Sequence, residues 1–194
     1  MKNFSIKAQA QMSILSNNLQ IMKERQQIIK NERRTKNKIY VASPLGFSEA
    51  GRLLNEKIIK LIQQLGGEVL DPWTLTPEAV EYPIINSLEP GIKKLDRLKK
   101  LNALVADNNE KAIRDADLIL AVLDGVDVDS GTASEIGYAA ALGKPVYGYK
   151  GDFRVAGDNE GAVVNLQVEF FILKKGQIVY SLEELKTLFT KILN

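Results

Sequence analysis

Apolar runs of strand length alternate with amphipathic segments along most of the chain. The apolar runs predict buried strands at residues 38–42, 68–70, 118–123, 146–149 and 177–180. Apolar positions at helical spacing predict helices at about residues 48–65, 92–114, 133–142 and 163–171, and after residue 181. Strands that alternate with helices predict an α/β fold with a five-stranded doubly wound parallel sheet, of the Rossmann-like or flavodoxin-like type.

Signals at the ends of segments support these bounds. Ser48 precedes the first predicted helix as a capping residue, and Gly66 follows it as a stop. Ser181 opens a capping box at the start of the terminal helix. The stretch after the second strand, which contains Pro77 and Pro83, predicts a long loop.

The N-terminal segment differs from the rest of the chain in composition. Residues 1–37 hold eight Lys and Arg and two Glu, a net charge of +6, whereas residues 38–194 carry −4. A rough helical stripe predicts a basic helical extension over 1–37, either solvated or packed against a partner subunit or an anionic surface. We expect the catalytic domain at 38–194, and its mild acidity argues against binding a nucleic-acid polymer.

Length and composition are those of one soluble α/β domain, with 194 residues, 45% hydrophobic and 26% charged. The sequence has neither a run of about 18 apolar residues nor a secretory signal, so we expect a cytoplasmic protein that does not insert into membranes.

The chain contains no cysteine and no histidine. These two absences exclude thiol and imidazole catalysis, disulfides, and zinc or iron sites held by those residues. An enzyme with this composition must use carboxylates, Tyr, Lys, Ser or Thr. We expect neither a cofactor nor a metal.

Ligands of such sheets bind beyond the carboxyl ends of the strands, here at loops 43–47, 71–76, 124–135 and 150–165. The first loop lacks the G-x-G-x-x-G fingerprint, and the chain has no P-loop. A dinucleotide-dependent enzyme or a P-loop ATPase is therefore not predicted.

Loop 124–135 concentrates carboxylates at this edge. Glu135 is predicted in the first turn of the helix at 133–142, where the helix dipole favours an ionised carboxylate that can act as a nucleophile. Asp129 is predicted to remain in the loop, free to bind a hydroxyl. Two alternatives are a Glu135 that only complements the dipole and a magnesium site of the receiver-domain kind, although the first strand lacks the acids that such a site needs.

Five motifs occur in one order over residues 38–171. They are Tyr40-Val-Ala-Ser-Pro, Asn109-x-x-x-Ile113 with Asp115-Ala-Asp117, Asp129-Ser-Gly-Thr-Ala-Ser-Glu135-Ile-Gly-Tyr-Ala, Gly143-Lys-Pro-Val, and Asp152-Phe-Arg154 with Asn165. Together they resemble the nucleoside 2-deoxyribosyltransferase family. The resemblance implies transfer of a deoxyribosyl group between nucleobases through a covalent ester on the enzyme.

The resemblance also implies roles for individual residues. Glu135 matches the nucleophile, Tyr40 the tyrosine that orients it, and Asp129 a residue that binds sugar hydroxyls. Asn165 matches an asparagine that binds the sugar and that several members donate from a neighbouring subunit, which implies a homo-oligomer.

The resemblance also implies which residues contact the nucleobase. Gly46 and Phe47 match a loop that packs on the base, and Asp71 and Trp73 are expected to line the same pocket. Asn109 stands where some members carry an aspartate that protonates the departing base. An amide can hydrogen-bond a base but cannot deliver that proton.

The resulting expectation is a nucleoside 2-deoxyribosyltransferase of nucleoside salvage, with 2′-deoxynucleosides and free nucleobases as its partners. The first alternative is an N-glycosidase that hydrolyses deoxynucleoside 5′-monophosphates. The second is a nucleotide-binding module without catalysis.

Overall fold

The computed structural model describes residues 37–193. Apart from Asn37, the predicted N-terminal extension lies outside the described residues. Among the helices that are described, none combines the length and the hydropathy that crossing a membrane requires.

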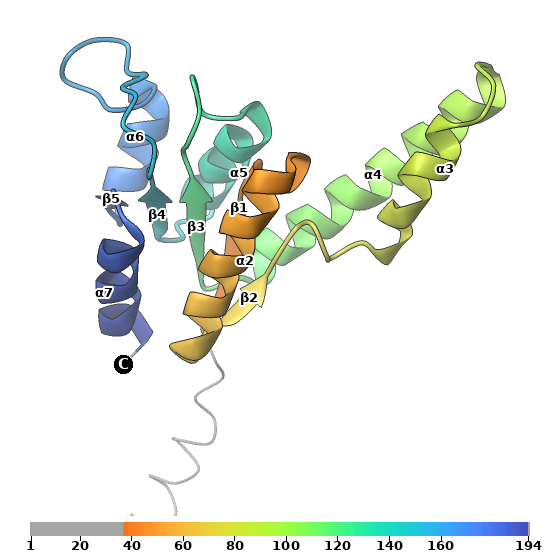
Figure 1. Cartoon of the computed structure of the whole chain (residues 1–194). Coiled ribbons are helices and arrows are strands. Elements are labelled where there is room, and N and C mark those ends of the chain that lie inside the picture. Colours follow the sequence, from red (N-terminus) through yellow and green to blue (C-terminus); the bar gives the residue numbers. More distant parts are fainter. Residues whose placement is uncertain (1–36, 194) are drawn as a thin grey trace, which may run out of the picture. The chain divides into compact units, whose positions relative to one another are not determined.

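The centre of the described chain is a parallel sheet, and it confirms the predicted doubly wound architecture. Its strands are β1 (Lys38–Ala42), β2 (Glu68–Leu70), β3 (Leu118–Val122), β4 (Val146–Tyr149) and β5 (Ile178–Val179). They are arranged in the order β2-β1-β3-β4-β5, the flavodoxin-like order (Figure 1). This order places the carboxyl ends of β1 and β3 next to each other at the middle of the sheet.

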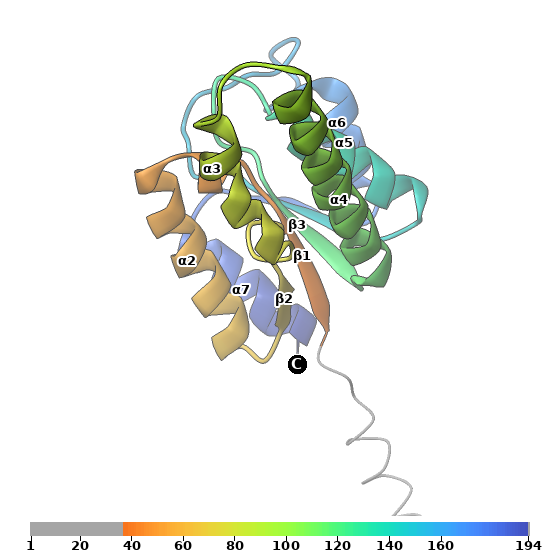
Figure 2. The same ribbon diagram turned by 90° about the vertical axis from the view of Figure 1, so that its right-hand side faces the viewer.

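Helices cover both faces of the sheet (Figure 2). The α-helices are α2 (Glu49–Gln64), α3 (Tyr82–Asn86), α4 (Ile92–Asp115), α5 (Ser130–Ala141), α6 (Leu166–Leu173) and α7 (Leu182–Leu193), and two 3-10 helices are η1 (Leu45–Phe47) and η2 (Pro77–Glu81). Buried residues of α2 and α7 pack on one face of β1 and β3, and those of α4, α5 and α6 pack on the other.

Successive side chains of β1 point to opposite faces of the sheet, so they enter two different cores. Ile39 and Val41 belong to the core under α2 and α7, whereas Tyr40 and Ala42 belong to the core under α4, α5 and α6. Tyr40 is thus directed to the same side of the sheet as α5.

Three predicted segments begin or end elsewhere. The helix predicted at 163–171 is α6, which begins at Leu166 because Asn165 caps it, and it ends at Leu173. The predicted long loop after β2 contains η2 and α3, with Pro77 and Pro83 in their first turns. The backbone N–H groups at the start of a helix have no partner within the helix. Proline, which has no N–H, therefore fits at this position. The predicted helix at 133–142 begins three residues earlier, at Ser130, because Asp129 caps it.

The segment from η2 to the first half of α4, residues 77–105, extends beyond the sheet, and we call it the arm (Figure 1). The Tyr82 hydroxyl donates to Asn102 Oδ1 at 2.7 Å, and Arg97 pairs with Glu81 at 3.2 Å. These contacts hold η2 and α3 along α4.

Candidate active site

Glu135 of α5 lies against Tyr40 of β1. The Tyr40 hydroxyl donates a hydrogen bond of 2.6 Å to Glu135 Oε1. The Tyr40 side chain is fully buried in the core between the sheet and α5. Since a buried strand residue has little freedom, this bond fixes one carboxylate oxygen of Glu135 and leaves the other for a ligand.

The protonation of Glu135 differs from the sequence-based expectation. Burial raises its pKa, the hydrogen bond from Tyr40 opposes that rise, and the negative charge of Asp129 adds to it, so that the resulting pKa is about 7. The prediction that Glu135 lies in the first turn, ionised by the helix dipole, is therefore wrong. With α5 starting at Ser130, Glu135 is beyond the first turn, where desolvation outweighs the dipole.

Asp129 has a structural contact in addition to its place beside Glu135. Its Oδ2 accepts hydrogen bonds from Thr132 N at 2.9 Å and Thr132 Oγ1 at 3.3 Å. The prediction of a free loop carboxylate is thus corrected: Asp129 is the N-cap of α5. It also lines the cavity described next, so part of its acceptor capacity faces a ligand site.

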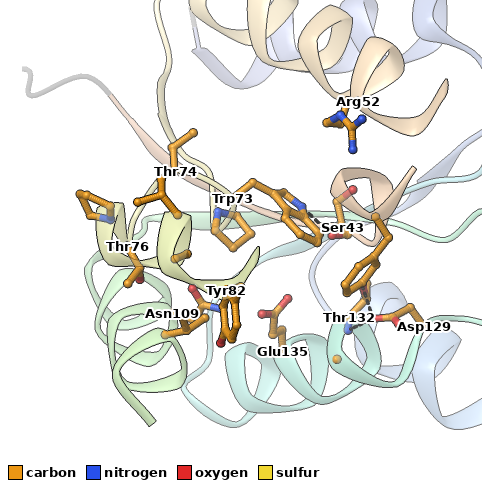
Figure 3. A pocket seen from close by; sticks show the side chains of 17 residues that line it. Ser43, Arg52, Trp73, Thr74, Thr76, Tyr82, Asn109, Asp129, Thr132 and Glu135 are labelled. Carbon is orange, nitrogen blue, oxygen red and sulfur yellow. Dashed lines mark hydrogen bonds between the residues drawn. The ribbon is translucent and has the colours of Figure 1, made fainter. Parts of the chain in front are cut away.

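A cavity of about 1150 Å³ opens at the carboxyl edge, beside Glu135 (Figure 3). Its lining comes from the segment between β1 and α2, from α2 itself, the segment after β2, the arm, the second half of α4, and α5 with its N-cap. The lining residues are Ser43, Phe47, Arg52, Pro72, Trp73, Thr74, Thr76, Pro77, Ala79, Val80, Tyr82, Val105, Asn109, Asp129, Gly131, Thr132 and Glu135. Tyr82 and Asn109 lie on one side of Glu135, and Thr132 and Asp129 lie on the other.

An aromatic pair forms one wall of the cavity. Phe47 and Trp73 meet edge to face, with ring centroids 4.7 Å apart, and Trp73 Nε1 donates to the Ser43 carbonyl at 3.1 Å. Gly46 does not line the cavity, but a Cβ at this position would overlap the Trp73 indole. Glycine therefore allows η1 to pack directly on Trp73.

Asp71, predicted as a substrate-binding residue, is not among the lining residues. It is buried, and its carboxylate accepts from Trp73 N at 3.2 Å and from Asn55 Nδ2 at 3.4 Å. Burial raises the pKa of Asp71. Its contacts place Asp71 behind the aromatic wall, as a support for Trp73.

Asn109 and Asn165 have different positions relative to the cavity. Asn109 lines it from α4, and its Oδ1 is buried without a hydrogen-bond partner in residues 37–193. Asn165 does not line it. The Asn165 side chain caps α6, where Oδ1 accepts from Gln167 N at 3.0 Å and Val168 N at 3.4 Å. Within one subunit, the Asn165 side chain is therefore engaged in capping α6 and does not line the cavity beside Glu135.

The Asp152 motif connects two loops at the same edge. Asp152 N donates to Asp124 Oδ1 at 2.9 Å, the Asp152 carboxylate accepts from Gly125 N at 3.3 Å, and Arg154 pairs with that carboxylate. These bonds fix the loop after β3 against the loop after β4.

Sequence reasoning missed the contribution of the arm and of α2. Val80, Tyr82 and Val105 line the cavity from the arm, and Arg52 lines it from α2. Pro77 and Pro83 were the available signal, because each fits the first turn of a helix as well as a loop.

Comparisons with known proteins identify a family and similar folds. A family model described as Nucleoside 2-deoxyribosyltransferase matches residues 39–167. A conserved protein from Enterococcus faecalis V583 is 28% identical, with a TM-score of 0.57 over 82% of this chain and 100% of that one. A search of curated proteins found no match.

Two further solved structures are similar. The 2-deoxyribosyltransferase of Bacillus psychrosaccharolyticus is 24% identical, with a TM-score of 0.54 over 77% of this chain and 90% of that one. The CMP N-glycosidase of Clostridium botulinum is 21% identical, with a TM-score of 0.45 over 81% of this chain and 99% of that one. The similarity to the Bacillus psychrosaccharolyticus structure supports the fold alone.

Proposed function

The chain belongs to the nucleoside 2-deoxyribosyltransferase family, and from that premise we propose that it exchanges the nucleobase of a 2′-deoxynucleoside by double displacement. The observation that carries the proposal is the hydrogen bond from Tyr40 to Glu135 beside a cavity of about 1150 Å³. A buried, oriented carboxylate next to a ligand-sized cavity is what a glycosyl-transferring nucleophile requires.

The first displacement forms an ester. The free oxygen of ionised Glu135 attacks C1′ of the deoxyribose, the C1′–N bond breaks, and its electron pair leaves with the base, which takes up a proton. Tyr40 holds Oε1 during this step, so the attacking oxygen has a fixed direction. A positive charge that develops at C1′ is stabilised by the carboxylates of Glu135 and Asp129.

The second displacement reverses the first with a new base. A ring nitrogen of the incoming base attacks C1′, the ester bond breaks, and the electron pair returns to Glu135. The incoming nitrogen loses a proton. Two inversions at C1′ give overall retention of configuration.

The departing base needs a proton that Asn109 cannot supply. Asp71 lies outside the lining of the cavity, which argues against it as a donor. Asp129 lines the cavity on the side of Glu135 opposite Asn109, away from the departing base, so a water molecule is the proposed source. Asn109 is proposed to hydrogen-bond the base edge.

We propose that the enzyme is a homo-oligomer in which Asn165 reaches the sugar of a neighbouring subunit. Two features support this: Asn165 does not line the cavity of its own subunit, and the helix that it caps has an exposed apolar side. That side consists of Leu166, Phe170 and Leu173.

The charge of the lining favours transfer over hydrolysis of a nucleoside monophosphate. Two carboxylates, Glu135 and Asp129, lie where the sugar would bind, and such charges repel a 5′-phosphate. The cation of the lining is Arg52, whose Nη1 donates to the Gly46 carbonyl at 3.1 Å. The structure of the cavity therefore supports a neutral 5′-hydroxyl.

Chromatography of reaction mixtures tests the proposal. The protein is incubated with deoxyinosine plus adenine, with deoxyinosine alone, with thymidine plus adenine, and with deoxynucleoside monophosphates. We expect deoxyadenosine from at least one donor, and none with Glu135→Ala. Glu183→Ala, on the exposed side of α7, is the matched control and should retain wild-type rates.

Other results would replace the proposal. Free base released only from the monophosphates would assign the N-glycosidase activity. Nucleoside binding without any product would assign the binding module.

A further inference from the structure

The cavity has an apolar part that the transfer of deoxyribose does not require. Pro77, Ala79, Val80, Tyr82 and Val105 contribute it from the arm, and we call these five residues the apolar recess. None of them carries a charge. The Tyr82 hydroxyl is already bonded to Asn102 Oδ1 at 2.7 Å.

The size of the cavity exceeds what a nucleoside needs. Pockets of roughly 300–1,000 Å³ accommodate drug-sized ligands, and a 2′-deoxynucleoside is at the small end of that class. The cavity here measures about 1150 Å³. A bound nucleoside would therefore leave the apolar recess in contact with water, which is unfavourable for apolar surface.

The chemistry at Glu135 sets the direction of the base. C1′ must lie within reach of the free oxygen of Glu135, with the sugar toward Asp129 and Thr132. The base then lies on the opposite side of Glu135, toward Tyr82 and Asn109 (Figure 3). A purine is bonded to C1′ through N9 and carries C6 on the ring remote from N9, so substituents at C6 extend away from Glu135 and toward the arm.

We propose that the apolar recess binds an apolar substituent on the nucleobase, and that the substrates include purines with an alkyl or benzyl group on the C6 amino nitrogen. This inference rests on the proposed function and adds a substrate class to it. The arm is the part of the site that selects these bases, whereas α5 and β1 provide the chemistry.

Competition between two acceptor bases tests the inference. Deoxyinosine is the donor, and adenine and N6-benzyladenine are the acceptors, with kcat/KM measured for each. We expect wild-type protein to use N6-benzyladenine at least as well as adenine. Val105→Phe fills the apolar recess and should lower kcat/KM for N6-benzyladenine about 10-fold or more while changing that for adenine little.

Leu104→Phe is the matched control, because it makes the same kind of change on α4 at a residue outside the lining. Ala79→Leu offers a second filling substitution should Val105→Phe fail to fold. Transfer to adenine without transfer to N6-benzyladenine would overturn the inference and leave the proposed function intact. Equal losses for both bases in the filled variants would overturn it as well. Transfer to neither base would overturn the proposed function, and the inference with it.

Discussion

At the scale of single residues, the protonation of Glu135 controls the proposed reaction. Only the ionised carboxylate is a nucleophile, and its pKa is about 7. We expect kcat/KM to rise with pH through an apparent pKa near that value. Tyr40→Phe removes the hydrogen bond that lowers this pKa, so the rise should move to higher pH by about one unit, with a lower maximum.

A pH profile of each variant provides the measurement. Tyr180→Phe is the control, since Tyr180 lies between β5 and α7 and is half exposed. An unchanged profile in Tyr40→Phe would contradict the role given to this hydrogen bond.

The same carboxylate should reduce the stability of the fold. The pKa of Glu135 in the folded state lies above its ordinary value of 4.5, so the unfolded chain releases this proton first as the pH rises. The contribution of Glu135 to the free energy of unfolding is therefore greatest below pH 4.5, decreases between pH 4.5 and 7, and remains low above. The loss amounts to about 3 kcal/mol.

Glu135→Gln abolishes this titration and keeps the shape of the side chain. We expect the variant to be more stable than wild type by up to about 3 kcal/mol at pH 8, with a much smaller difference at pH 5. Urea unfolding at the two pH values measures both differences. A difference that does not change with pH would show that Glu135 is not desolvated as described.

The sequence predicts the identities of these two residues but not their environment. Family motifs single out Tyr40 and Glu135, and the position of β1 explains why they meet. The degree of burial depends on how closely α5 packs on the sheet, which is a property of side chains distant in sequence. The raised pKa therefore follows only from the structure.

At the scale of elements, the start of α5 determines what Asp129 does. The residues from Asp129 to Thr132 include Ser130 and Gly131, which are common in loops, and the sequence pattern therefore places the helix start too late. The structure shows an Asp N-cap with Thr132 N as its partner at 2.9 Å. The Asp129 carboxylate therefore caps α5, and its proposed contact with the sugar is a second, separate role.

Two substitutions separate these properties. Asp129→Ala removes the cap and should lower the free energy of unfolding by about 1 kcal/mol. Asp129→Asn keeps an acceptor for Thr132 N, so its stability should remain close to wild type. Because Asn lacks the charge that raises the pKa of Glu135, the rise of kcat/KM should move to lower pH. Denaturant unfolding and a pH profile measure the two effects, and equal destabilisation by both variants would contradict the capping role.

The contact between η1 and the aromatic wall gives another prediction. Gly46→Ala places a Cβ against the Trp73 indole, and relief of that overlap must displace η1 or the ring. We expect a loss of about 1–3 kcal/mol of stability and a raised KM for the base. Gly91→Ala is the control, since its Cβ meets no atom within 4 Å. A Gly46→Ala variant with wild-type KM would show that the wall does not contact the base.

Most elements of the fold follow from the sequence, and the exceptions have physical causes. The central strands are continuous apolar runs, as strands covered on both faces must be, and Leu118–Val122 is buried along its whole length. The sequence predicts a loop between β2 and α4, because proline interrupts regular structure. Its two short helices depend on packing against α4, which a local pattern does not contain.

At the scale of the whole molecule, the outer side of α6 exposes three large apolar side chains, Leu166, Phe170 and Leu173. Six of its eight residues are apolar, on its exposed side as well as its buried side, and Phe170 remains 57% exposed. A helix of this kind is normally covered on both sides. A second copy of the chain would cover it and would bring Asn165 of each subunit to the interface.

Phe170→Glu tests this arrangement. We expect the variant to sediment as a smaller species than wild type and to lose about 10-fold or more in kcat/KM, because an interface anchor and a sugar-binding residue are lost together. Leu53→Glu introduces the same charge at an exposed position of α2 and should change neither property. Unaltered sedimentation of Phe170→Glu would remove α6 from the interface.

The hydrogen bond between Tyr40 and Glu135 joins residues that are 95 positions apart in the chain. Contacts of such long sequence separation are slow to form, because a large loop must close before they are gained. Helices, whose contacts are local, can therefore form before β1 and α5 dock. The proposed nucleophile is held in position only once β1 and α5 have docked, so we expect a partly folded chain to lack transferase activity.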